Sequence, residues 1–209
     1  MDQKFEKANK QSEDFFAASI KGSGNNIHKM VGYSEYSHLK RFEEMLKLGD
    51  FTDKSLLDVG CGPAAFYKFL KSKQIFPEYH GIDISQEMIQ VAKELNSDIS
   101  ENFLLHDIVK EDIHKTYDYL ICIGILNLDF GGTTNIEMTK VLIQQLFKHA
   151  KIGFAISMTS NLSNKPTSGT YYYDSSEIIK FVSELTNNFI LSHSYLANDF
   201  TLFCYKHQN

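Results

Sequence analysis

Residues Leu56 to Ala65 have the sequence Leu-Leu-Asp-Val-Gly-Cys-Gly-Pro-Ala-Ala, and this stretch decides the fold. An apolar run ends at two closely spaced glycines, Gly60 and Gly62, and resumes as Phe66–Leu70, which predicts a buried strand, a tight turn and a helix start. Because glycine has no Cβ, the turn is able to adopt positive φ angles and approach a ligand, and the helix start offers unpaired N–H groups. The stretch therefore predicts a site for a nucleotide-like cofactor.

The segments that follow alternate between strand-like and helix-like patterns, which predicts a mostly parallel sheet with helices on both faces. The last two strands, Phe189–Leu196 and Phe200–Tyr205, are too close for a crossover and predict a hairpin, which adds one antiparallel strand. The other expected strands are Ser55–Val59, Tyr79–Ile84, Asn102–His106, Tyr119–Ile123 and Gly153–Met158, and the expected helices are Ser34–Leu48, Ala64–Ser72, Gln86–Leu95, Ile136–His149 and Ser175–Thr186.

The N-terminal segment precedes this alternation. Apolar side chains in residues 1–21 recur at helical spacing and predict an amphipathic helix or two, which either packs on the core or forms a lid over the active site. The glycine-containing stretch Lys21–Asn26 predicts a flexible break, a possible hinge of such a lid. We expect a single domain over residues 1–209, with a helical lid or cap over 1–30 and the core over 31–206.

Composition and charge exclude several classes of protein. No apolar run approaches the length of a membrane span, and the N-terminus lacks the apolar core of a signal peptide, so we expect a cytoplasmic protein without a membrane partner. Cys61, Cys122 and Cys204 lie far apart without a C-x-x-C spacing, which indicates neither disulfides nor a metal site. A net charge of −5 without a Lys/Arg cluster argues against nucleic acid as the main partner. We expect a monomer or a homodimer.

Carboxylates follow several of the predicted parallel strands, where ligands of such sheets bind. Asp83 lies 23 residues after Gly60 (83 − 60), the distance at which a carboxylate binds both hydroxyls of a ribose. An Asp at this place is also able to cap the next helix, a role that we assign to Ser85. Asp107 and Ile108 are expected to meet the adenine edge.

Two side chains next to Asp83 are expected to pack against the adenine faces. These are Ile84 and Met88, although the helical spacing of Met88 also suits a plain core residue.

The glycine spacing leaves two cofactors open. Gly60-x-Gly62-x-x-Ala65 satisfies the dinucleotide fingerprint, which would make the protein an NAD-dependent oxidoreductase. Three features favour S-adenosylmethionine. Asp58 is placed to reach the amino group of a methionine moiety, Pro63 lacks the N–H that a pyrophosphate would need, and the terminal hairpin replaces the second nucleotide-binding half.

These segments resemble the motifs of the class I S-adenosylmethionine-dependent methyltransferase superfamily. Leu57–Ala64 resembles its first motif, Gly81–Ser85 the second, His106–Ile108 the adenine-contacting third and Tyr117–Gly124 the fourth. The resemblance covers about residues 30 to 206 and implies a Rossmann-like, doubly wound, mostly parallel seven-stranded sheet with one antiparallel strand. Two departures stand out: Ala64 replaces a frequent glycine, and no Asn/Asp-Pro-Pro-Tyr sequence follows the fourth strand. The second departure weakens a case for methylation of bases or glutamine amides.

The chain is also similar to small bacterial members of that superfamily whose N-terminal segment resembles Gly32–Phe42, a similarity that supports the fold and cofactor more than the acceptor. From this segment, Tyr33 is expected to close over the methionine end and face the sulfonium, or to pack as an ordinary aromatic. Arg41 is expected to pair with the cofactor's carboxylate, or to lie on a solvated face. The expected cofactor-binding residues are Tyr33, Arg41, Asp58, Gly60, Cys61, Gly62, Asp83, Ile84, Met88, Asp107, Ile108 and Gly124.

The resemblance implies transfer of a methyl group by in-line displacement to an O or N atom of a small-molecule substrate. A hydroxyl acceptor would need a general base, for which His38 and Asp129 are candidates, with His106 also near the expected site. An amine acceptor would need only an orienting group such as Asn127. The acceptor pocket is expected from residues 127–132, Asn161 and Tyr171–Tyr173. The alternatives are a methyltransferase acting on tRNA or protein, and a catalytically silent cofactor-binding module.

Overall fold

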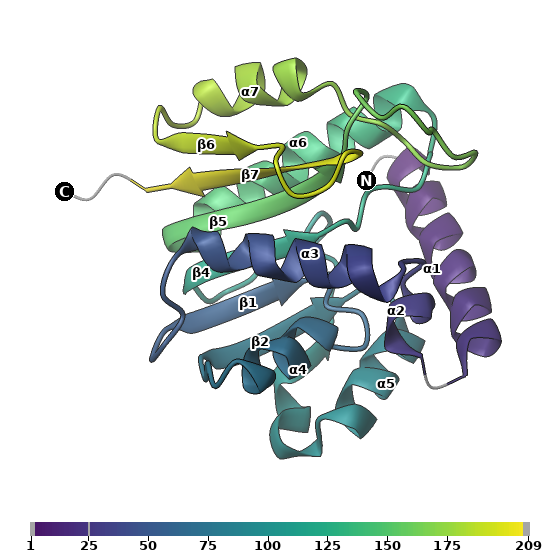
Figure 1. The fold of residues 1–209 in the computed structure, drawn as a ribbon, viewed down its shortest axis with the longest axis vertical. Coiled ribbons are helices and arrows are strands. Elements are labelled where there is room, and N and C mark those ends of the chain that lie inside the picture. Colours follow the sequence, from purple (N-terminus) through teal and green to yellow (C-terminus); the bar gives the residue numbers. More distant parts are fainter. Residues whose placement is uncertain (1–2, 25, 207–209) are drawn as a thin grey trace.

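A computed structural model describes residues 3–24 and 26–206 and contains a seven-stranded sheet in the order β3-β2-β1-β4-β5-β7-β6 (Figure 1). The strand order reverses between β1 and β4, as in doubly wound folds. This confirms the predicted fold class. The strands are β1 (Ser55–Val59), β2 (Glu78–Asp83), β3 (Phe103–Leu105), β4 (Tyr117–Ile123), β5 (Ala150–Thr159), β6 (Phe189–Ser192) and β7 (Asp199–Tyr205). The α-helices are α1 (Gln3–Ser23), α2 (Ile27–Met30), α3 (Glu35–Met45), α4 (Ala65–Ser72), α5 (Gln86–Leu95), α6 (Gly132–His149) and α7 (Ser175–Ser183).

The centre of the sheet is parallel. β1 pairs in parallel with both β2 and β4, and all five of its residues are buried, which explains its near-continuous apolar sequence. β7 runs antiparallel to both β5 and β6, as the short hairpin connection predicted. β4 begins two residues earlier than expected because Tyr117 pairs with Ala150 on β5, and Asp118 exchanges hydrogen bonds with Ser55 on β1.

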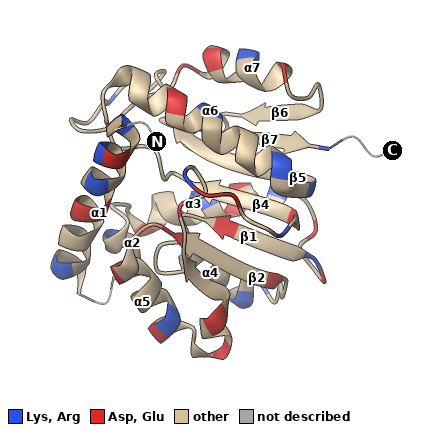
Figure 2. Ribbon diagram, turned by 180° about the vertical axis from the view of Figure 1, so that it is seen from behind, with Lys and Arg blue, Asp and Glu red and all other residues tan. Residues whose placement is uncertain are grey.

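Helices cover both faces of the sheet and form two apolar cores. One face packs against α3, α4 and α5 through residues such as Phe42, Phe66 and Ile89, and the other packs against α6 and α7 through residues such as Leu142 and Ile178 (Figures 1 and 2). None of the helices in residues 3–24 and 26–206 is long and apolar enough to cross a membrane.

The N-terminal segment differs from the prediction in detail. A single helix, α1, continues to Ser23 through the first half of the predicted break, whereas Asn25 lies outside the described residues. Asn26 caps the short helix α2, accepting hydrogen bonds from the N–H groups of His28 and Lys29, and this helix was not predicted. In Figure 1, α1 stands across the carboxyl ends of the parallel strands, beside α2. That is the edge at which a doubly wound sheet binds its ligand.

Candidate active site

The turn after β1 is held against β2. The backbone N–H groups of Gly60 and Cys61 both donate to the carbonyl of Ile82, at 2.8 and 3.0 Å. Gly60 has a φ of +70°, and a Cβ built there would lie 2.0 Å from Cγ2 of Ile125. Gly62, at a φ of +52°, is also left-handed. The expected positive φ angles are therefore present, and they bring the backbone to the edge of a cavity.

Ala64 occupies a conformation that favours glycine. Its φ and ψ of 56° and 39° are left-handed, and it precedes the first residue of α4 without a side-chain cap. Its side chain is buried. A left-handed non-glycine residue costs on the order of 1 kcal/mol, so the departure from the frequent glycine leaves local strain at the turn.

Asp83 ends β2 and links the glycine turn to the next helix. Its two carboxylate oxygens accept hydrogen bonds from the N–H groups of Gly62 and Ser85, both at 2.9 Å. The hydroxyl of Ser85 caps α5 by accepting from the N–H of Met88, as assigned from the sequence. Burial raises the pKa of Asp83, and the N–H donors of Ser85 and Gly62 oppose this rise.

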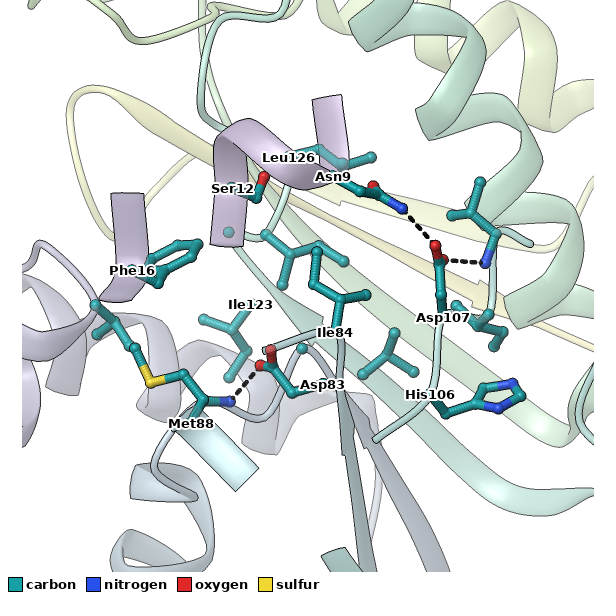
Figure 3. Close-up of a pocket in the computed structure, with 18 of the residues that line it drawn as sticks. Asn9, Ser12, Phe16, Asp83, Ile84, Met88, His106, Asp107, Ile123 and Leu126 are labelled. Atoms are coloured by element: carbon teal, nitrogen blue, oxygen red, sulfur yellow. Dashed lines mark hydrogen bonds between the residues drawn. The ribbon is translucent and has the colours of Figure 1, made fainter. Parts of the chain in front are cut away.

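A cavity of about 800 Å³, counted to its open mouth, lies beside this carboxylate (Figure 3). Nine of the predicted cofactor residues line it: Tyr33, Gly60, Gly62, Asp83, Ile84, Met88, Asp107, Ile108 and Gly124. Residues from motifs that are spread along the sequence therefore line a single cavity.

Helix α1 supplies a wall of this cavity through residues that the sequence analysis did not single out as site residues. Asn9, Ser12 and Phe16 line it, and Asn9 donates a hydrogen bond from Nδ2 to Oδ2 of Asp107 (Figure 3). Oδ1 of Asp107 accepts from the N–H of Val109 at 3.0 Å. The three α1 residues lie at positions 9, 12 and 16, a helical spacing that places them on one face of the helix. Polar residues at two of these positions are a signal that could have been noticed.

A smaller cavity of about 320 Å³ adjoins the first. The two share Val31, Tyr33, Gly60 and Ile123, so they meet at these residues. The shared residues define what we call the junction. The predicted residues Asp58, Cys61 and His38 line the second cavity only.

Asp58 is buried in β1 and faces this second cavity. Its Oδ2 accepts a hydrogen bond from the hydroxyl of Tyr79 on β2. Burial raises the pKa of Asp58 to about 7, and the Tyr79 hydroxyl opposes this rise. A group with this pKa changes charge near neutral pH and would respond to a cation placed beside it.

Tyr33 occupies the junction with its hydroxyl above the end of β4. Nδ2 of Asn127 donates to this hydroxyl at 3.2 Å, and a Cβ on Gly124 would lie 2.1 Å from it. The guanidinium of Arg41 stacks on the ring at 3.9 Å from the ring centroid. One ring face is therefore already in contact with a cation.

Arg41 is buried, so its alternative placement on a solvated face was wrong. Its Nε lies 2.6 Å from Oδ2 of Asp199 at the start of β7, and Nη1 donates to the carbonyl of Ser37 at 3.1 Å. Arg41 lines neither of the two cavities. Its contact with a cofactor carboxylate stays a prediction, and the structure instead gives it Asp199 and Tyr33 as partners.

The three candidate catalytic residues have different surroundings. His38 lines the second cavity, with Nδ1 2.9 Å from Nδ1 of His28, and its pKa is lowered to about 3 by burial, by His28 and by Arg41. Asn127 does not line either cavity, because its amide oxygen accepts from Thr159 and its amide nitrogen donates to Tyr33.

Asp129, the third candidate, is exposed, and its Oδ1 accepts from the N–H of Gly131 in the turn before α6. It lines neither cavity. The expected acceptor residues Asn161 and Tyr171–Tyr173 also lie outside both linings. The hydroxyl of Tyr173 instead donates to the carbonyl of Leu126, in the segment after β4, at 2.7 Å.

Comparisons with known proteins agree with this architecture. A family model described as a methyltransferase domain matches residues 57–153. A malonyl-[acyl-carrier protein] O-methyltransferase of Acetivibrio thermocellus is 28% identical over 54% of this chain, and the match spans only 38% of that protein. A Mycobacterium tuberculosis protein named as a methyltransferase is 26% identical over 73% of this chain and 93% of its own length.

Among solved structures, the magnesium protoporphyrin IX methyltransferase of Synechocystis PCC 6803, solved with bound S-adenosylmethionine, superposes with a TM-score of 0.68 at 17% identity. The match covers 95% of this chain and 97% of that one. Residues 57–153 therefore match a methyltransferase domain, and the chain has the fold of the class I S-adenosylmethionine-dependent methyltransferases. The glycine turn, Asp83 and the sheet order are the features that first indicated this class.

Proposed function

We propose that this protein transfers a methyl group from S-adenosylmethionine to an oxygen or nitrogen atom of a small-molecule acceptor. The observation that carries the proposal is the pair of cavities that meet at Tyr33 and Gly60. The larger one has Asp83 and Asp107 at its rim for an adenosine, and the smaller one has Asp58 for an amino-acid moiety.

The residues present fit this cofactor. The left-handed turn at Gly60 and Gly62 leaves room that a side chain would fill, and the carboxylates offer acceptors for hydroxyl, amino and ammonium groups. When bound, the cofactor supplies a methyl group on a sulfonium, so that a new bond from the acceptor to carbon forms while the carbon–sulfur bond breaks and sulfur keeps the electron pair. This chain contributes orientation and exclusion of water.

The acceptor side of the larger cavity is apolar and covered. Beyond the junction it is lined by Phe16, Ile125, Leu126 and Met138, with α1 across the opening of the sheet (Figures 1 and 3). Charges of both signs are interspersed on the surface of α1 in Figure 2, without a basic stripe that a nucleic acid would require. A small, largely apolar acceptor fits this lining better than a macromolecule.

The protonation states favour an acceptor that needs no general base. His38, with a pKa of about 3, remains neutral and is a weak proton acceptor, and Asp129 lies outside both cavities. A neutral amine or a carboxylate carries a lone pair at neutral pH and is able to attack the methyl carbon unaided. An amine acceptor then releases its proton to water after transfer.

A screen with methyl-tritiated S-adenosylmethionine tests the proposal. Label should enter metabolites of a small-molecule extract with the wild-type protein and fall to background with Asp83→Ala. Transfer of label to tRNA or protein fractions alone would assign a macromolecular acceptor instead. Binding of S-adenosylhomocysteine without any labelled product would favour a catalytically silent module.

A further inference from the structure

The positive charge of Arg41, next to the junction residue Tyr33, is paired with a carboxylate from a distant part of the chain. Arg41, on α3, is buried, and its Nε lies 2.6 Å from Oδ2 of Asp199, the first residue of β7, which is also buried. The segments are separated by more than 150 residues along the chain (199 − 41 = 158). Desolvation of such a pair is costly, and Nε of Arg41 and both carboxylate oxygens of Asp199 make no hydrogen bond among the described residues, so the attraction between the two charges is what opposes this cost.

The Arg41–Asp199 ion pair contacts the candidate site through the ring of Tyr33. The Arg41 guanidinium stacks on Tyr33, and Tyr33 lines both cavities at their junction. The pKa of the Tyr33 hydroxyl is raised mainly by burial, while the charge of Arg41 opposes this rise and that of Asp199 adds to it. The charges of Arg41 and Asp199 therefore both act on the Tyr33 hydroxyl at the junction.

A cofactor with its adenosine in the larger cavity and its amino-acid part in the smaller one has its sulfur at this junction. S-adenosylmethionine carries a positive charge on that sulfur, whereas S-adenosylhomocysteine, the product, is a neutral thioether. A guanidinium without its carboxylate would repel only the first of these two ligands. The buried location makes this repulsion weakly screened by solvent.

We propose that Asp199 is a specificity-determining residue which, by neutralising Arg41 beneath Tyr33, keeps the site open to the cationic cofactor and limits its preference for the neutral product. The inference rests on the proposed function of the same site. By this proposal, a residue of the C-terminal hairpin influences binding at the sulfur of the cofactor, although Asp199 lines neither cavity.

Other charges near the pair do not replace Asp199. Glu44 on α3 is buried, but Lys47 donates to its Oε2 at 2.6 Å. His193 also acts on Asp199 electrostatically, and its Nε2 lies 2.8 Å from the hydroxyl of Ser160. Among the described residues, Asp199 is the carboxylate within ion-pair distance of the Arg41 guanidinium.

The test is the ratio of the dissociation constants of S-adenosylmethionine and S-adenosylhomocysteine, measured by calorimetry. Asp199→Asn keeps the shape of the side chain and removes its negative charge. The ratio should then rise about tenfold, the effect expected when one uncompensated unit charge acts on the sulfonium from a partly buried position. The double variant Arg41→Met/Asp199→Asn removes both charges and should return the ratio to within about twofold of the wild-type value.

Glu177→Gln is the matched control, since it removes one negative charge from an ion pair with Lys140 on the surface. It should leave the ratio unchanged. Equal weakening of both ligands by Asp199→Asn, or a ratio within about twofold of wild type, would overturn the proposal and indicate a purely structural ion pair.

Two further measurements cover a poorly folded Asp199→Asn. The shift in thermal midpoint caused by each ligand gives the same ratio in a destabilised protein. Arg41→Met removes the positive charge alone and must lower the ratio or leave it unchanged, so a rise contradicts the proposal. A wild-type protein that binds neither ligand would refute the proposed function itself, an outcome separate from an unchanged ratio.

Discussion

The two cavities differ in how the chain builds them. The larger cavity depends on residues that directly follow β1, β2 and β3, and its central contacts join Asp83 to Gly62 and Ser85, neighbours in space that are at most 21 residues apart. At the junction with the smaller cavity, Tyr33 depends on Arg41, Asp199 and Asn127, which come from three distant parts of the chain. The contacts around Asp83 are encoded locally, whereas those around Tyr33 are assembled by tertiary packing. Changes in the two regions should therefore fail in different ways.

The largest effect is expected in the local region. Asp83→Ala removes the carboxylate proposed for the ribose, and it leaves the N–H groups of Gly62 and Ser85 without their acceptor. Hydrogen bonds to a charged group contribute about 1.5–3 kcal/mol each, so affinity for S-adenosylhomocysteine should fall at least about 100-fold in calorimetry. Asp98→Ala, in a surface pair with Lys71, is the control. Affinity retained within about threefold would remove Asp83 from the cofactor site.

Gly60→Ala should be next in size and should act on folding as well as binding. The new Cβ would approach Cγ2 of Ile125 to 2.0 Å at a φ of +70°. We expect a loss of about 2–3 kcal/mol in the free energy of unfolding by urea denaturation. Adding Ile125→Ala removes the clash but not the strain, and should recover part of the loss. A fully stable Gly60→Ala variant would contradict the geometry of the turn.

Asp58→Asn links the two regions, since Asp58 belongs to β1 but faces the second cavity. Its pKa is about 7 in the folded protein against 3.8 ordinarily, so the unfolded chain ionises first and this group lowers stability as pH rises from about 4 to 7. The variant should therefore be more stable than the wild type by about 1–3 kcal/mol at about pH 8, a difference that vanishes near pH 4.

The same variant should bind the cofactor about tenfold more weakly at about pH 8, because the amino group loses its carboxylate partner. In the wild type, affinity should rise from about pH 6 to 8 as Asp58 ionises, and binding below pH 7 should release a proton. Calorimetry in buffers with different ionisation enthalpies measures this release. Binding that is independent of pH and buffer would exclude Asp58 as the partner of the amino group.

The smallest effect is expected from Ala64→Gly. It relieves a left-handed alanine with a φ of 56°, but glycine also gives the unfolded chain more freedom. We expect a change between zero and about 1 kcal/mol toward greater stability in thermal unfolding, with cofactor binding unchanged. Destabilisation by more than about 1 kcal/mol would show that the packing of the Ala64 methyl group stabilises the fold by more than the left-handed backbone destabilises it.

Several elements were predictable because their signals are local. Five consecutive buried residues in β1, the glycines after it and the Ser85 cap of α5 each follow from sequence patterns a few residues long. The helix α2 and the continuation of α1 to Ser23 were not predicted, since a four-residue helix has no periodicity and glycine breaks are weak boundaries. The hydrogen bonds of Asn127 and Tyr173 were not predicted, because their partners, Thr159 on β5 and Leu126 after β4, lie more than 30 residues away along the chain.

The sequence alone determined the order of strands and helices, the glycine turn and the carboxylates after the parallel strands, since each depends on neighbours along the chain. Only the tertiary structure decided that Asn9 of α1 contacts Asp107 and that Arg41 pairs with Asp199 beneath Tyr33. The physical reason is that a buried charge or amide requires a partner, and any distant segment that packing brings close is able to supply it.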